Sequence, residues 1–481
     1  MPLITLLHIS YLGTGLATIR ILFRGRDYPW HFRFILAYYV GIFVHIVILH
    51  LAIVFTITSP IVTWLLLCIG LLGLLFEVAN GLRTSPFSFG RFPVDYKNKC
   101  LNGFLAILLL TPAIYLITLR LVAVPDISFD PTAFWNLKAK YFFYGQHLWT
   151  DTFLDVDRIN EHRDYPLYMP IFNFEHYSII GKADDFATKA GTWIYYGTGL
   201  LLFFCLVSEW AGNKVALLTT AFVLYSPAYS YDAYASITST YVDFPLSLMI
   251  LVSTGFLVRY LRSGHTIDLF GSAMAASSAT LQKTEGTVWA VIFIGFTVLI
   301  ISKQRNREWK NDYAWLLLPL FTLGGWYLIK SRLPYDLDIE NPTIEQLFSL
   351  WKVAPKMLVA WVASIFKIEP WGLLPFFTIP AFMVGLIRNS HDTIKLVPAL
   401  MVLCYLASNF IAFMILDVQL GSFDLYMRVS YNRHIIQILL VSVFLAVAMN
   451  TLKFVGEDDS NVQGNKCSTF GSLAESANGS N

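Results

Sequence analysis

Residues that could do chemistry gather in a few short polar stretches, and each stretch borders a long apolar block of this 481-residue chain. These stretches supply carboxylates, cations and aromatic rings, at Asp130, His162, Arg163, Asp164, Tyr165, Asp243, Lys283, Glu285, Arg433 and His434. A carboxylate can accept a proton from a reacting hydroxyl group, and Arg and Lys bind phosphate well. The residue types therefore indicate proton transfer beside a bound anion.

The elements that must position these residues are apolar blocks of transmembrane length. The chain is 56% hydrophobic and only 14% charged, whereas soluble proteins carry about a quarter charged residues. Since a span takes about 17–25 apolar residues, the sequence predicts an all-α polytopic membrane protein with about 13 transmembrane helices. The blocks lie near 3–23, 34–57, 61–79, 101–123, 184–207, 214–229, 241–258, 266–282, 286–302, 313–330, 371–388, 395–416 and 435–451.

Two segments depart from the simple pattern of apolar spans. The block 266–282 is rich in small and polar residues (AMAASSAT), and such helices pack tightly inside a bundle. A segment near 345–366 looks too short to span, so we expect it to lie in the membrane interface.

Positive charge predicts the orientation of the chain. Arg and Lys fill the loops after the first, third, seventh and ninth blocks, which the positive-inside rule assigns to the cytoplasm. The opposite face then receives 124–183, 230–240, 283–285, 331–370 and 417–434. We expect one transmembrane domain over 1–455, with a catalytic loop at 124–183 and a second outer loop at 331–370. The polar tail 456–481 is expected to be disordered in the cytoplasm.

The stretch that follows Asp130 reads as a helix lying on the membrane surface. Phe134, Leu137, Tyr141 and Tyr144 recur at helical spacing, and the lysines between them are expected to point toward lipid headgroups. Asp130 is then either a simple N-cap or a general base. Asp243 likewise could orient a base, bind a metal or cap its helix.

Metal and nucleic-acid sites have no strong pattern in this sequence. The five cysteines (68, 100, 205, 404 and 467) are scattered without a CxxC pair, which indicates neither a disulfide framework nor a zinc site. A divalent metal remains possible, although no ligand spacing specifies one. No basic patch interleaves with stacking aromatics, so we expect no nucleic-acid partner.

Several motifs in this order resemble the GT-C glycosyltransferases, in particular the protein O-mannosyltransferases and the aminoarabinose transferase of lipid A. FDPTAFWNLKAKYFFYGQHLW and HRDYPLYMPIFNFEHYSIIGKADDFATKA resemble their first outer loop, with an acidic residue heading a juxtamembrane helix. The stretch YVDFPL resembles the acidic residue that opens a later helix, and LQKTEG resembles a K-x-E-G tip. Two departures are the four blocks before the loop, where one is common, and Pro131 in place of a frequent second acidic residue.

The resemblance implies a GT-C-like bundle whose outer loop carries amphipathic juxtamembrane helices. It implies transfer of a sugar from a polyprenyl-phosphate donor to an extracytoplasmic glycan, lipid or protein, with inversion and with Asp130 as general base. Asp243 would be the second catalytic residue, and substrate would contact His162, Arg163, Asp164, Tyr165, Lys283, Glu285, Arg433 and His434. Such an enzyme would sit among lipids of the cell (inner) membrane, with its site on the extracytoplasmic face.

Two other functional classes fit the composition. A transporter or flippase of lipid-linked sugars would also have many spans and no soluble domain, but would place ionisable residues near the bilayer midplane on broken helices. A nonenzymatic assembly scaffold would leave the ordered outer motifs without a purpose. The gathering of charge at one predicted surface favours the glycosyltransferase.

Overall fold

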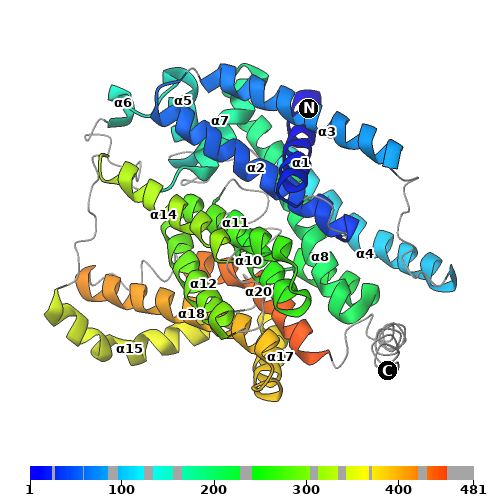
Figure 1. Ribbon diagram of the computed structural model, residues 1–481. Coiled ribbons are helices and arrows are strands. Elements are labelled where there is room, and N and C mark those ends of the chain that lie inside the picture. Colours follow the sequence, from blue (N-terminus) through cyan, green and yellow to red (C-terminus); the bar gives the residue numbers. More distant parts are fainter. Residues whose placement is uncertain are drawn as a thin grey trace, which may run out of the picture.

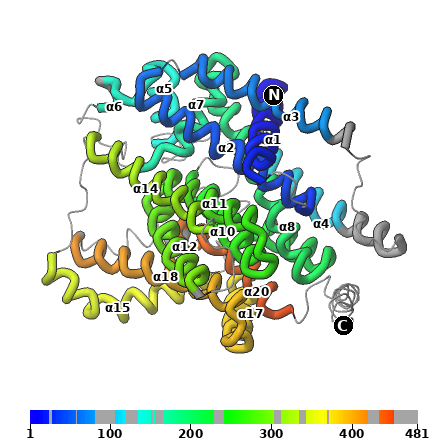
Figure 2. The backbone as a smooth tube through the Cα atoms, in the orientation of Figure 1, coloured from blue at the N-terminus to red at the C-terminus, as the bar shows by residue number. Residues whose placement is uncertain are grey.

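The computed structural model describes the chain in eleven stretches, shown in colour in Figure 2 apart from a few residues inside helices: 1–23, 28–57, 59–84, 96–123, 134–154, 165–227, 241–303, 312–333, 343–367, 371–420 and 431–451. Within these stretches the fold is helical and contains no strand. Asp130, His162, Arg163, Asp164 and the tail 456–481 lie outside the described residues.

The helices follow the apolar blocks closely (Figure 1). Their bounds are α1 (Pro2–Leu22), α2 (Trp30–Val54), α3 (Ser59–Thr84), α4 (Tyr96–Ala123), α5 (Asn136–Gly145), α6 (Asp151–Leu154), α7 (Tyr168–Ile180), α8 (Asp185–Leu224), α10 (Asp243–Ser263), α11 (Thr266–Gln282), α12 (Thr284–Lys303), α13 (Asp312–Trp315), α14 (Leu317–Lys330), α15 (Ile344–Ile365), α17 (Leu374–Arg388), α18 (Thr393–Leu420) and α20 (Tyr431–Asn450).

Nine helices in the described part of the chain are long and apolar enough to cross a membrane. The protein is therefore a multi-pass membrane protein by length and composition of its helices, while the count of about 13 spans stays a prediction. The fifth and sixth blocks join in α8, which is interrupted at Gly212, where φ is 80° and ψ is 164°. α15 is 22 residues long and is one of the nine, so the premise that this segment is short is wrong, while its place in the membrane interface stays a prediction.

Two helices illustrate how residue size sets the packing. Every residue of α11 from Ile267 to Gln282 is buried, as expected for the small and polar block. α1 and α2 cross at backbone contact, because a Cβ on Gly15 would lie 1.7 Å from the carbonyl oxygen of Ala37. Small residues allow such close approach between helices in a membrane.

The helix ends predicted on the cytoplasmic face meet one another. Arg259, at the end of α10, pairs with Glu209 of α8 and, at 3.1 Å, with Asp268 of α11. Tyr28, just before α2, donates to Asp268. These residues lie in or beside the short links that follow the first, fifth and seventh apolar blocks, so the structure groups them as alternating spans require.

Segments predicted on the outer face also meet. The indole of Trp149, in the loop after α5, donates to the carbonyl oxygen of Val54 at the end of α2 over 2.8 Å. The Ser59 hydroxyl, at the start of α3, donates to the carbonyl oxygen of Gln146 over 2.6 Å. The link between α2 and α3 therefore lies against the loop that carries α5, α6 and α7, at the top of Figure 1.

Candidate functional site: a buried charge cluster at the ends of α10, α11 and α20

Asp243 is the first residue of α10, the most enclosed of the nine long apolar helices, with 94% of its most apolar window buried. Its carboxylate is fully buried and receives three hydrogen bonds. Lys283 Nζ donates to Oδ1 over 2.9 Å, Gln437 Nε2 donates to the same oxygen over 2.7 Å, and Arg433 Nε donates to Oδ2 over 2.8 Å. The N-cap residue of α10 is Val242, and no side-chain cap hydrogen bond is made there. The Asp243 carboxylate is instead engaged by donors from other segments.

The tight tip between α11 and α12 places Lys283 beside Asp243. α11 ends at Gln282 and α12 begins at Thr284. A Cβ on Gly286 would lie 1.9 Å from the carbonyl oxygen of Ala279, so only glycine permits the two helices to approach this closely. The K-T-E-G sequence thus turns the chain sharply, and Lys283 Nζ lies 2.8 Å from Glu285 Oε1.

Arg433 and His434 reach the same point from the first turn of α20. The Arg433 guanidinium also lies over the ring of Tyr241, 5.0 Å from its centroid. His434 Nε2 is 3.6 Å from Glu285 Oε1, and its buried Nδ1 has no hydrogen-bond partner among the described residues.

Charges within the cluster nearly balance. Two carboxylates, Asp243 and Glu285, face two cations, Lys283 and Arg433, with His434 at the margin. Burial lowers the pKa of Lys283, but the two carboxylates outweigh burial, so its pKa is raised above the ordinary value. Lys283 is therefore a protonated ammonium. Two of its three N–H groups point at carboxylates, and one is left over.

Five of the sequence-predicted site residues thus come together from three distant segments: Asp243, Lys283, Glu285, Arg433 and His434. The ring of Tyr165 stacks on the ring of Trp135, with the two centroids 5.9 Å apart. The other four predicted residues, Asp130, His162, Arg163 and Asp164, cannot be placed because they lie outside the described residues.

Gln437 is a site residue that the sequence reasoning missed. It lies four residues after Arg433 on α20, and so on the same helix face. Its Nε2 binds Asp243, and its Oε1 accepts a 2.7 Å hydrogen bond from the Tyr405 hydroxyl. A glutamine one turn after a predicted site arginine, inside an apolar block, is the pattern that could have revealed it.

The prediction that the lysines of α5 point toward headgroups is wrong for Lys138. Lys138 is fully buried, with Nζ 5.6 Å from the centroid of the Trp135 ring. Lys140 Nζ instead donates to Asp185 Oδ2, at the start of α8, over 2.9 Å. Because Asn136, Lys138, Ala139 and Phe142 are all buried, α5 is packed against its neighbours.

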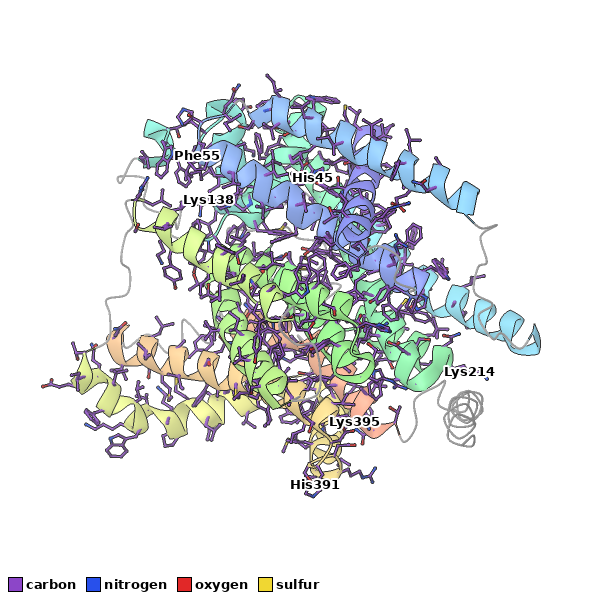
Figure 3. All side chains as sticks on the ribbon, in the orientation of Figure 1. His45, Phe55, Lys138, Lys214, His391 and Lys395 are labelled. Carbon is purple, nitrogen blue, oxygen red and sulfur yellow. The ribbon has the colours of Figure 1, made fainter. Side chains whose placement is uncertain are left out.

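A second buried polar cluster joins α7 to α1 and α2. Glu175 of α7 accepts hydrogen bonds from Tyr11 Oη over 2.8 Å and from His45 Nδ1 over 2.7 Å. All three side chains are buried. His45, which is labelled in Figure 3, lies on α2. Sequence analysis did not single out these residues, since each is isolated within an apolar block.

The neighbouring imidazoles of this second cluster form a directed chain. His176 Nδ1 donates to the carbonyl oxygen of Phe172 over 2.7 Å, so its Nε2 accepts when the ring is neutral. His8 Nε2, 3.2 Å away, is then the donor, and His8 Nδ1 accepts from Tyr38 Oη over 2.7 Å. Burial lowers the pKa of His176, which favours this neutral arrangement.

Neither a metal centre nor a disulfide is formed within the described part of the chain. No group of three or more His, Cys, Asp or Glu side chains there is arranged to hold a metal ion. Cys68, Cys205 and Cys404 are free thiols.

Comparison with known proteins gives no match: no family model, no curated protein and no solved structure is similar to this chain.

Proposed function

We propose that this chain is an integral-membrane glycosyltransferase of the GT-C type, which moves a sugar from a polyprenyl-phosphate donor to an acceptor outside the cytoplasm. One observation carries the proposal. Asp243, Lys283, Glu285, Arg433 and His434, which the motif resemblance selected from distant segments, form one buried cluster at a common end of the bundle.

Asp130 is the proposed general base. It takes the proton of an acceptor hydroxyl while the acceptor oxygen attacks the anomeric carbon. The bond from that carbon to the phosphate oxygen breaks, and the lipid phosphate leaves with the electron pair. One displacement inverts the anomeric centre and needs no covalent sugar–enzyme intermediate.

Asp243 is the proposed positioning residue for the cations. Both of its oxygens are occupied by donors from Lys283, Arg433 and Gln437, which leaves it poorly placed to accept a proton from substrate. Since the cluster is nearly neutral, an incoming phosphate is held by the one remaining N–H group of Lys283 and by His434 at the edge of the cluster. Cations of the preceding loop, Arg163 and His162, supply further positive charge in this proposal.

Sidedness follows from the charge pattern. The Arg259 cluster groups the links that carry Arg and Lys, which the positive-inside rule assigns to the cytoplasm, while Lys283 lies in the alternate set of links. The proposal therefore places the Asp243 cluster on the extracytoplasmic side of a cell membrane.

The test is the pair of variants Asp130→Asn and Asp126→Asn. Asn caps a helix about as well as Asp but cannot act as a base, so Asp130→Asn should lower transfer by about 10²–10⁴-fold. Asp126→Asn, the matched control, should stay active. Transfer is measured with purified protein, a polyprenyl-phosphate sugar and candidate acceptors, by the mass added to the acceptor. If the Asp130→Asn protein keeps more than about a third of wild-type turnover, Asp130 is not the general base, because loss of the base should lower the rate by about 10²–10⁴-fold.

The second buried cluster favours one rival, a transporter of lipid-linked sugars. Ionisable residues inside membrane helices mark functional pathways, and His45 of α2 is such a residue, paired with Glu175 of α7. Their hydrogen bonds, however, are made to each other, to Tyr11 and to Thr14, as in a structural joint. Release of lipid-linked sugar across a liposome membrane without any acceptor would support the transporter instead.

A further inference from the structure

Two buried asparagines face each other between α5 and α7. Asn173 Nδ2 donates to Asn136 Oδ1 over 2.8 Å, and both side chains are fully buried. The remaining atoms, Asn136 Nδ2 and Asn173 Oδ1, have no hydrogen-bond partner among the described residues. Two facing amides could exchange two hydrogen bonds, but this pair makes one and leaves a buried donor and a buried acceptor side by side.

This open donor and acceptor do not depend on how the amides are oriented. Amide orientation is assigned from the hydrogen-bond network. If both amides were turned over, Asn136 would donate to Asn173, and one acceptor and one donor would again be left. Buried polar groups without partners are costly, so the pair calls for a ligand that both donates and accepts. A hydroxyl group does both.

A third open group lies beside the asparagine pair. Trp135, next to Asn136 in the chain, is fully buried, and its Nε1 has no partner among the residues described. On the other side of the pair, the ring of Phe172, next to Asn173, lies 5.9 Å from the ring of Tyr195. The Tyr195 hydroxyl accepts a hydrogen bond of 3.3 Å from Gln282, the residue before Lys283. Packed side chains therefore link the asparagine pair to the tip that carries Lys283.

We propose that Trp135, Asn136 and Asn173 form a subsite for the neutral hydroxyl groups of the transferred sugar, adjoining the Asp243–Lys283 cluster. This inference rests on the proposed function and specifies it. Adjacent ring hydroxyls supply the donor and the acceptor that Asn173 Oδ1 and Asn136 Nδ2 lack. The subsite predicts that the protein binds a sugar-bearing lipid phosphate more tightly than the same lipid phosphate without a sugar.

The test measures binding of soluble probes to the full-length protein in detergent. The probes are neryl phosphate and its glucosyl, mannosyl and galactosyl esters. For the wild type, at least one ester should bind about 10-fold more tightly than neryl phosphate, the gain expected from one or two neutral hydrogen bonds. The double variant Asn136→Leu/Asn173→Leu should lose that preference and bind neryl phosphate as the wild type does.

The double variant separates recognition from a structural role. Replacing both partners of a buried hydrogen bond by apolar groups of similar shape is nearly neutral for stability, so α5 and α7 should stay joined. Unchanged binding of neryl phosphate would show that the variant is folded. If the double variant keeps the wild-type preference for an ester, the asparagines only join two helices and the inference is overturned.

A different result would overturn the proposed function as well. If wild-type protein does not bind neryl phosphate at all, both the lipid-phosphate site and the sugar subsite are wrong. If the wild type binds neryl phosphate and every ester equally, the subsite is wrong while the lipid-phosphate site stands.

Discussion

Asp243→Asn should be the most destabilising single change in the charge cluster, although it alters almost no volume. The variant removes the negative charge that faces both Lys283 and Arg433, and its amide NH₂ opposes one of their donors. Lys283→Met is milder, because Asp243 then keeps Arg433 and Gln437. The two changes together remove both members of the ion pair between Asp243 and Lys283.

The distances set the size of the effect. Two unit charges 2.9 Å apart attract by about 6 kcal/mol at an effective dielectric constant of about 20. Desolvation offsets much of this attraction, and removing one partner from a buried pair typically costs about 3–5 kcal/mol. We expect Asp243→Asn to lower the free energy of unfolding by about 3–5 kcal/mol. For Lys283→Met we expect a loss of about 1.5–3 kcal/mol, the value of a charge-assisted hydrogen bond.

The double-mutant cycle is the decisive measurement. Unfolding of purified protein by SDS in mixed micelles, followed by circular dichroism, gives the free energy of unfolding of each variant. Contacting residues couple by about 0.5–3 kcal/mol, so the double variant should lose less stability than the two single variants summed. Arg332→Met is the control, since Arg332 is exposed and such changes stay within about 0.5 kcal/mol. Single costs that add to within about 0.5 kcal/mol would refute a buried ion pair between Asp243 and Lys283.

Three further predictions test the frame around the site. Reporter fusions after residue 306 should read as cytoplasmic and those near residue 155 as external; a cytoplasmic reading at 155 would contradict the proposed face. Gly286→Ala should cost about 1–3 kcal/mol of unfolding free energy, because overpacking at a backbone contact forces α12 away from α11; an unchanged SDS midpoint would show that the tip is looser. Glu175→Gln should cost about 1–3 kcal/mol by the same titration, because the amide accepts from His45 but cannot accept from Tyr11 through its nitrogen; no loss would mean that the joint is not needed for stability.

Local hydropathy and charge were enough to predict the helices and the common location of the site residues. Each apolar block became helical, and the alternation of spans brings every second link to the same end of the bundle. With 345–366 left out of the count as a surface segment, that rule places the start of α10, the tip at Lys283 and the start of α20 together, as their ion pairs require. The K-T-E-G tip was predictable because a charged residue between two apolar blocks, followed by glycine, leaves room only for a tight turn.

Burial of polar side chains was not predictable in the same way. Helical periodicity shows which residues of 134–145 share a face, but it does not show what covers each face. Lys138 was therefore expected to point toward lipid headgroups, although it is fully buried beside the Trp135 ring. Gln437 and Glu175 were not predicted, for a related reason. Each is an isolated polar residue in an apolar block, and its hydrogen-bond partner comes from a helix that is distant in sequence.

The buried hydrogen bonds to α7 and its loop indicate a structural role for the N-terminal helices. The loop carrying α5 and α7 follows four apolar blocks, whereas the proteins it resembles commonly place one span before it. α1 and α2 are joined to α7 by the hydrogen bonds from Tyr11 and His45 to Glu175. The end of α2 holds the loop after α5 through the hydrogen bond from Trp149 to Val54. Since α7 carries Asn173 and is preceded by Tyr165, the additional helices fix the residues that adjoin the charge cluster. On this reasoning the departure in span number is compatible with the proposed chemistry, because the extra spans act as a rigid support for the loop on which that chemistry depends.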